Sequence, residues 1–209
     1  MEKMAERWNF ICIRILQLAY LNLLWFSFTL LGLVLFGIGP ATFAMFTVIR
    51  KWIRGNADVA IFPTYWKAYR ENFKETASIG LLYAVIGLIL YTDLLYVQSL
   101  WLRIILLMVS ICYLISSLYI FPVIAHYDWK SVVLKIKCSF LFGISYFQYS
   151  LMLIVILGVM CVIQIIVPGL LLFFGISGGG YVIMWFANQV FMRMEIQAGL
   201  IEEENARTT

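Results

Sequence analysis

Four long stretches of this chain carry no charged side chain, and this feature limits its fold more than any other. The longest runs for 55 residues, from Cys138 to Met192, and the others cover residues 15–49, 76–92 and 104–127. A helix needs about 20 apolar residues to cross the hydrocarbon layer of a membrane, so these stretches can hold five or six membrane helices. The pattern predicts an integral membrane protein, in agreement with a charged fraction of only 12% and a mean hydropathy of +0.95.

This composition excludes a soluble enzyme, a nucleic-acid-binding domain and a secreted disulfide scaffold. A membrane β-barrel is excluded as well, because its strands would alternate apolar and polar residues and the run LMLIVILGVMCVIQIIV at 151–167 does not. The predicted fold class is therefore all-α. Glu2 and Glu6 flank the first apolar run, which is too long for the apolar region of a signal peptide. We expect this first helix to be retained rather than cleaved.

Residues 1–209 are predicted to form a single membrane domain, a bundle of six helices of which the second is short. The first break is expected at Gly37 to Pro40, because two glycines followed by a proline end one helix and begin the next. The last charge-free stretch turns either at Pro168-Gly169, which we adopt, or at Gly175 to Gly180. The predicted helices cover about residues 8–36, 40–54, 76–96, 101–125, 147–167 and 170–193.

The placement of Lys and Arg predicts the topology, because these residues collect on the cytoplasmic side of a membrane. In the six-helix topology 14 of the 15 Lys and Arg residues lie inside, and only Arg103 lies outside. If residues 40–54 do not cross, five helices remain, the N-terminus lies outside, and the count becomes 11 inside and 4 outside. We prefer the six-helix topology, which describes a multi-pass protein of the cell membrane with both termini in the cytoplasm.

Residues 63–75, between the second and third predicted membrane helices, have an amphipathic pattern. Charged residues occupy one helical face, and the other face carries Tyr65, Trp66, Tyr69 and Phe73. We predict a helix that lies in the membrane interface, either as an aromatic anchor or as a docking surface for a partner. Topology and anionic lipid are sufficient to explain a second basic connector, whose lysines are Lys130, Lys135 and Lys137.

Side chains for catalysis or metal binding are sparse. His126 is the one histidine, and the four cysteines show no CxxC spacing. We therefore expect no catalytic residue, no cofactor and no metal site, and not an enzyme. The helices also lack the ionisable residue that ion-coupled transporters hold at membrane depth. The neutral polar side chains either link helices by hydrogen bonds or line a path for a neutral solute, and they are Asn22, Thr29, Ser116, Ser117, Gln164, Asn188 and Gln189.

Four short motifs, taken in order, resemble those of the YesL family of bacterial membrane proteins, a family of unknown function. The motifs are Asn22-Leu23-Leu24-Trp25, Gly37-Ile38-Gly39-Pro40-Ala41-Thr42, Arg50-Lys51-Trp52 with Gly55, and Trp66 followed by Asn72-Phe73. One departure is Tyr65, where the family pattern implies Phe. The resemblance implies a Gram-positive plasma membrane and genes that often neighbour carbohydrate importers of the ATP-binding-cassette (ABC) type. It implies no established activity and no catalytic residues.

Three functional hypotheses follow. The preferred one is an accessory or assembly subunit associated with a carbohydrate ABC importer, in contact with its permease subunits. The alternatives are a small facilitator or transporter for a neutral solute and a membrane partner of a sensor kinase. The predicted interaction surface comprises Arg50, Lys51, Trp52, Arg54, Tyr65, Trp66, Tyr69 and Phe73. The residues predicted to build and pack the first hairpin are Asn22, Trp25, Gly37, Gly39 and Pro40.

Overall fold

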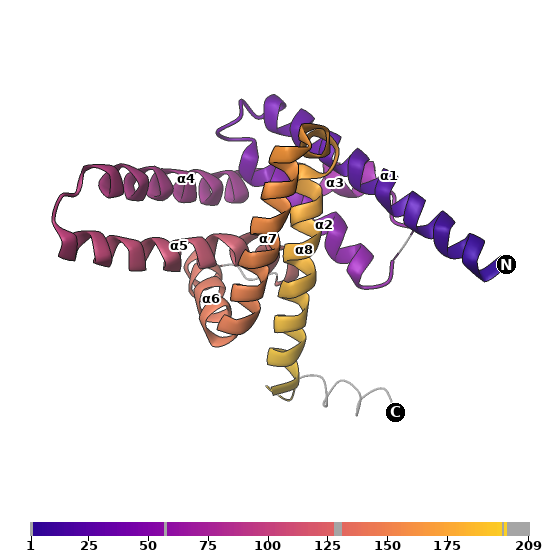
Figure 1. Ribbon diagram of the computed structural model, residues 1–209. Helices are drawn as coiled ribbons and strands as arrows, with labels where there is room; N and C mark the ends of the chain where they lie inside the picture. Colours follow the sequence, from indigo (N-terminus) through magenta and orange to yellow (C-terminus); the bar gives the residue numbers. More distant parts are fainter. Residues whose placement is uncertain (1, 57, 128–130, 198, 200–209) are drawn as a thin grey trace.

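A computed structural model describes residues 2–56, 58–127, 131–197 and 199, with side chains for those from Cys12 to Ile196. These residues form eight helices and no strand (Figure 1). The helices are α1 (Glu2–Leu31), α2 (Ile38–Ile53), α3 (Ile61–Glu71), α4 (Phe73–Tyr96), α5 (Leu100–His126), α6 (Val132–Ser145), α7 (Phe147–Ile166) and α8 (Pro168–Gln197).

Five of these helices contain segments that are long and apolar enough to cross a membrane. The segments are Cys12–Leu31, Phe73–Tyr96, Leu100–His126, Phe147–Ile166 and Pro168–Ile196. The predicted class, an all-α multi-pass membrane protein, is confirmed by this arrangement. The short second helix is not among the five, since α2 has 16 residues and a length of about 24 Å against roughly 30 Å of hydrocarbon.

The first break in the chain lies earlier than the expected segment from Gly37 to Pro40. α1 ends at Leu31, a turn covers residues 32–37, and Pro40 lies in the first turn of α2. Leu33 and Val34 have positive φ angles of 57° and 61°, a conformation that side chains of this kind rarely adopt. The turn closes because Gly32 and Gly37 touch through their backbones, which leaves no room for a side chain at either position.

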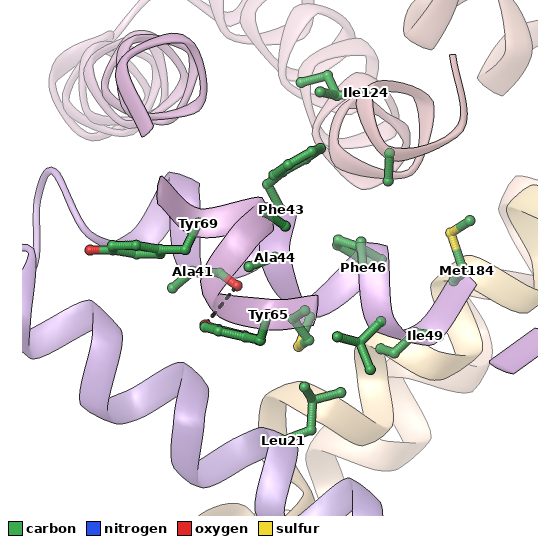
Figure 2. Close-up of a cluster of buried hydrophobic side chains, with 14 of the residues drawn as sticks. Leu21, Ala41, Phe43, Ala44, Phe46, Ile49, Tyr65, Tyr69, Ile124 and Met184 are labelled. Carbon is green, nitrogen blue, oxygen red and sulfur yellow. Dashed lines mark hydrogen bonds between the residues drawn. The ribbon is translucent and has the colours of Figure 1, made fainter. Parts of the chain in front are cut away.

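α2 lies at the centre of the fold, and ten of its residues are buried. It packs against α1, α3, α4, α5 and α8. Figure 2 shows its buried side chains facing Leu21 of α1, Ile124 of α5 and Met184 of α8. Near its start, Gly39 contacts the backbone of α4 at Thr76 and Gly80, and a Cβ at Gly39 would overlap the Thr76 carbonyl. α4 therefore begins beside the start of α2.

The amphipathic segment has a different environment from the one its pattern predicts. The helix expected over residues 63–75 is interrupted, because α3 ends at Glu71 and α4 begins at Phe73. Tyr65 and Tyr69 are buried within the protein and surround the ring of Phe28 together with other aromatic residues. The Tyr65 hydroxyl donates to the Ala41 carbonyl at 3.0 Å (Figure 2). Tyr65 and Tyr69, two of the four aromatic residues on the predicted face, therefore pack inside the protein against α1 and α2, whereas Trp66 remains exposed.

The second half of the chain contains a helix that the pattern did not predict, α6, which includes Lys135 and Lys137 of the second basic connector. Ser131 caps it by accepting from the Leu134 amide. Lys130 of that connector lies outside the described residues. α7 and α8 then form a hairpin whose turn is at Val167, not at Gly175 to Gly180. In Figure 1 the α4–α5 hairpin extends away from the other helices and runs across the direction of α7 and α8.

Candidate functional site

A basic pocket of about 400 Å³ lies where α2, α3 and the end of α5 meet. Its charged residues are Arg50 and Lys51 from α2, and Lys67 and Glu71 from α3, so cations outnumber anions by three to one. Apolar and neutral polar side chains complete the lining, and they are Phe43, Thr47, Pro63, Thr64, Ala68, Asn72, Ile124 and Ala125. We refer to this hollow as the basic pocket.

The cations of the basic pocket differ in how firmly they are held. The Arg50 guanidinium donates to the carbonyl of Ala125, in the last turn of α5, where a positive charge also compensates the helix dipole. Lys51 and Lys67 are exposed on the pocket wall. A second hollow of about 430 Å³ shares Lys51 and Thr64 with the basic pocket. The pocket thus joins one fixed guanidinium to two ammonium groups that face solvent.

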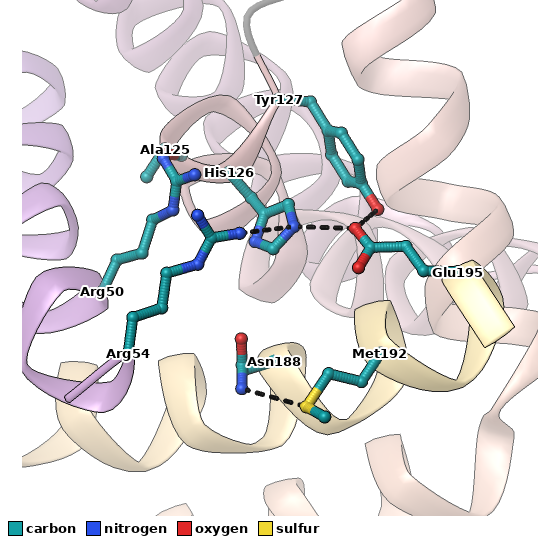
Figure 3. Close-up of polar contacts among 8 residues, drawn as sticks. All are labelled: Arg50, Arg54, Ala125, His126, Tyr127, Asn188, Met192 and Glu195. Atoms are coloured by element: carbon teal, nitrogen blue, oxygen red, sulfur yellow. Dashed lines mark hydrogen bonds and ion pairs between the residues drawn. The ribbon is translucent and has the colours of Figure 1, made fainter. Parts of the chain in front are cut away.

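Beside the pocket, a polar cluster joins the ends of α2, α5 and α8. His126 is buried, and its Nε2 atom lies 3.0 Å from Glu195 Oε1 and 3.3 Å from Arg54 Nη2 (Figure 3). A ring nitrogen either donates or accepts, so Nε2 donates to Glu195 or accepts from Arg54 but does not do both. The Tyr127 hydroxyl donates to the same Glu195 oxygen at 3.2 Å. We call these four residues the His126 cluster.

The protonation of Tyr127 follows from its surroundings. Burial and the neighbouring Glu195 carboxylate raise the pKa of Tyr127 above its ordinary value, because both disfavour a phenolate. The hydroxyl therefore keeps its proton and donates to Glu195. The cluster connects α8 to the pocket through Arg54. This residue is the C-cap of α2 and follows Arg50, a pocket residue, by four positions.

The structure divides the predicted interaction surface into an exposed and a buried part. Trp52, Tyr65 and Tyr69 are buried, so they stabilise the fold and are not available to a partner. Arg14 stacks over Trp52, with its guanidinium carbon 5.3 Å from the ring centre. Phe73 is half-buried, whereas Trp66 keeps 44% of its surface exposed. The spacing of Tyr65, Trp66 and Tyr69 was correct for a helix, but it did not distinguish the buried rings from the exposed one.

The residues predicted for the first hairpin lie at close contacts between helices. The side chain of Asn22, fully buried, accepts from the amides of Ile176 and Ser177 and donates to the Leu172 carbonyl. The Trp25 indole donates to Thr42 Oγ1 at 3.0 Å, which joins α1 to α2. Gly37 meets the backbone of Thr29 and leaves no space for a Cβ.

Other neutral polar residues also connect helices. Ser116 of α5 shares a hydrogen bond of 2.7 Å with the Tyr83 hydroxyl of α4, and Gln164 of α7 donates to the Gly175 carbonyl of α8. Asn188 has its contact within α8, to the sulfur of Met192. The contacts of Ser116 and Gln164 are of the kind that hold membrane helices together.

Two ion-pair residues were missed by the sequence analysis. Lys135, assigned there to anionic lipid, is buried and forms an ion pair with Glu75 of α4. Glu195, the partner of His126, attracted no notice because it follows the last long apolar stretch. The partners in these pairs lie 60 and 69 residues apart, so no local spacing connects them. Among the described residues, no group of three His, Cys, Asp or Glu side chains is placed to hold a metal ion.

The fold and the site define a small multi-pass membrane protein with a basic pocket built on a buried central helix. The family model described as "Protein of unknown function, DUF624" matches residues 18–94, a range that contains α2 and α3 and therefore most of the pocket. The chain belongs to this family, as its resemblance to the YesL family predicted.

Three relatives from Bacillus subtilis (strain 168), each an uncharacterized protein, align over most of the chain. YteU is 36% identical over 193 residues, covering 90% of this chain and 86% of YteU. YesV is 34% identical over 192 residues, covering 89% and 92%. YesL is 32% identical over 177 residues, covering 82% and 83%. The likeness of the whole sequence suggests YesL itself, but at 32% identity YesL is a relative of the chain and not the same protein. No solved structure matches the chain.

Proposed function

We propose that the protein is an accessory or assembly subunit of a carbohydrate importer of the ABC type, and that it contacts its partner through the basic pocket. The importer class comes from the family resemblance. The pocket carries the docking part of the proposal, because three cations surround a hollow large enough to accept side chains of another protein. No catalytic role is proposed for any residue of the pocket.

The chemistry of the pocket suits an acidic segment of a partner. A carboxylate that enters it meets Arg50, whose position is set by the Ala125 carbonyl, so little side-chain entropy is lost on binding. Lys51 and Lys67 are exposed and act over longer range, and exposed charges mainly raise the rate of association and exclude wrong partners. Glu71 on the same wall disfavours a uniformly acidic ligand, which adds selectivity.

The proposal places the basic pocket on the cytoplasmic side, as in the six-helix topology. Two contacts support a second helix that returns beside the first: Trp25 with Thr42, and Arg14 with Trp52. They run in opposite order along the two helices, so α2 is antiparallel to α1 and reaches the depth of Arg14. In the six-helix topology α2 starts on the outer side of the membrane and α4 starts on the inner side. The contact between Gly39 and Thr76 brings these two starts together, so it favours the five-helix alternative.

Cysteine labelling of intact cells decides between the two topologies. In a background without native cysteines, we expect an impermeant reagent to modify a cysteine at Gln98 and to spare cysteines at Lys3 and Asn56. Modification at Lys3 from outside would replace the six-helix topology by the five-helix one.

Docking is tested by charge reversal at the two exposed cations. The variant Lys51→Glu with Lys67→Glu should lose crosslinked partners in native membranes and slow growth on the relevant carbohydrate, while the protein still accumulates. The matched control is Lys74→Glu, an exposed lysine of α4 outside the pocket. The variant Lys51→Arg with Lys67→Arg keeps the charge and should retain partners. Unchanged crosslinking and growth in the reversed variant would overturn the docking proposal.

The solute-facilitator alternative has one supporting observation. A hollow of about 290 Å³ lies between α2, α5 and α8, and Thr42 and Ser117 contribute hydroxyl groups to an otherwise apolar lining. Solute uptake into vesicles that contain this protein alone would favour this alternative over a subunit. Co-purification from native membranes separates the remaining two hypotheses. An accessory subunit of an importer should co-purify with permease subunits, and a signalling partner should co-purify with a sensor kinase.

A further inference from the structure

An apolar groove of about 440 Å³ lies where α4, α5 and α6 meet, and it shares no lining residue with the basic pocket. Its walls are aliphatic and aromatic, and they include Leu82, Ile86 and Leu90 of α4, Val109 of α5, and Phe140 of α6. The surrounding surface of the α4–α5 hairpin is exposed and apolar, so in a membrane the groove opens toward lipid hydrocarbon.

The groove has a direction. Leu90 and Val109 lie nearer the tip of the hairpin, and Leu82 and Ser116 lie nearer its base. Leu82 and Leu90 are eight positions apart on α4, which corresponds to about 12 Å of helix. α6 closes the base end and contributes Lys137, the one charged residue in the lining. The groove is therefore lined by apolar side chains along its length and has one cation, Lys137, at its base end.

An ion pair beside Lys137 sets the position of the start of α6. Lys135, two residues earlier on α6, pairs with Glu75 in the first turn of α4. This pair holds the start of α6 against the start of α4, at the base of the groove. Lys137 itself is exposed, so its ammonium group can reach a ligand that enters from the lipid side. Its flexible stem can follow an apolar wall while the charge remains in a polar layer.

We propose that the groove binds one anionic phospholipid, with an acyl chain between α4 and α5 and the phosphate group held by Lys137. An empty apolar hollow of this size would forfeit the contacts of all its lining side chains, whereas an acyl chain restores them. A single cation at the end of such a hollow complements a headgroup that carries a net negative charge. The bound lipid fills the gap between the hairpin and α6. This inference does not depend on the proposed docking function.

A native cysteine makes the proposal testable, because Cys112 lines the groove. The full-length protein with Cys12, Cys138 and Cys161 replaced by serine is purified in detergent, and the rate of Cys112 modification by a small maleimide is measured. Phosphatidylglycerol should slow this reaction several-fold. Phosphatidylcholine with the same acyl chains, and inorganic phosphate alone, should slow it much less.

The headgroup contact is tested with Lys137→Gln, which should raise the phosphatidylglycerol concentration needed for protection about fivefold, the effect of one lysine at an anionic surface. Lys67→Gln, in the basic pocket, is the matched control and should leave protection unchanged. As a second measurement, phosphatidylglycerol retained after purification is quantified by mass spectrometry, and Ile86→Trp should reduce it by filling the groove.

Three outcomes would overturn the proposal. Equal protection by phosphatidylcholine and phosphatidylglycerol would remove the role of Lys137. A disulfide between Cys112 residues of two chains, formed in place of lipid protection, would assign the groove to a second copy of the protein. Retention of phosphatidylglycerol that is unchanged in Ile86→Trp would place the bound lipid elsewhere.

Discussion

The centre of the molecule and the outer part of the α4–α5 hairpin are built from similarly apolar sequence but are held in different ways. Around α2, side chains such as Leu21, Ala41 and Ile49 have no exposed surface, and glycine contacts and hydrogen bonds join the helices. In the outer hairpin, Leu88, Leu100 and Trp101 are 64%, 69% and 78% exposed. The polar contacts of the outer hairpin join residues that are close in sequence. One example is Arg103, which donates to the Val97 carbonyl.

This difference shows which parts of the fold depend on protein contacts and which depend on the membrane. Lipid chains are as apolar as leucine, so burial gives little drive for helices to associate, and close packing and polar contacts supply it. The centre has both kinds of contact. The outer hairpin has few, and its exposed apolar side chains suit lipid surroundings. The predictions below test this contrast in detergent micelles, where the lipid is absent.

The largest effect is expected for Gly39→Leu. The new side chain would overlap the backbone of Thr76, so α2 and α4 must separate, and we expect a loss of about 3 kcal/mol in the free energy of unfolding. Reversible unfolding in mixed micelles measures it. Gly158→Leu on α7 is the matched control, because nothing lies within 4 Å of a Cβ there. Similar stabilities of the two variants would contradict the close contact between α2 and α4.

Lys135→Ala is expected to cost about 2 kcal/mol, because it leaves Glu75 without its cation. This loss of stability is smaller than the loss expected on breaking a fully buried ion pair, because the Glu75 side chain is 33% exposed and partly screened by solvent. Replacing both residues by methionine should restore part of the loss in the same unfolding assay. A double variant less stable than Lys135→Ala would indicate that the pair acts through another contact.

Asn22→Ala should cost about 1.5 kcal/mol, because the Ile176 and Ser177 amides lose their acceptor on α1. The effect is moderate, since α8 can still form its own backbone hydrogen bonds. Asn188→Ala is the control, as this side chain donates to a methionine sulfur four residues away on the same helix and the described residues offer it no hydrogen bond to α1. Unfolding midpoints that do not differ between the two variants would rule out the link between α1 and α8.

The smallest effect is expected in the outer hairpin. Leu88→Ala should change stability in micelles by less than about 0.5 kcal/mol, because most of that side chain contacts no protein. Leu21→Ala, the same substitution at a fully buried position, should cost about 3 kcal/mol. If the two substitutions cost the same, the contrast between the regions is wrong.

Much of the fold was predictable because a membrane imposes simple constraints. The length of the charge-free stretches determines how many helices can cross, and the absence of alternation excludes a barrel. Pro168 marks the turn between α7 and α8, since proline favours the first turn of a helix. The charged lining of the basic pocket was partly predicted too, because Arg50 and Lys51 belong to a motif that resembles the family pattern.

The sequence by itself determined that this chain is an all-α membrane protein, and approximately where its long apolar helices lie. Only the tertiary structure decided which side of each helix is covered. Helical spacing places Tyr65, Trp66 and Tyr69 together, yet two of these rings are buried against Phe28 and one is exposed. The pairs of Lys135 with Glu75 and of His126 with Glu195 form because distant helices meet. A local pattern records periodicity along one helix, and it carries no information about which other helix will pack against it.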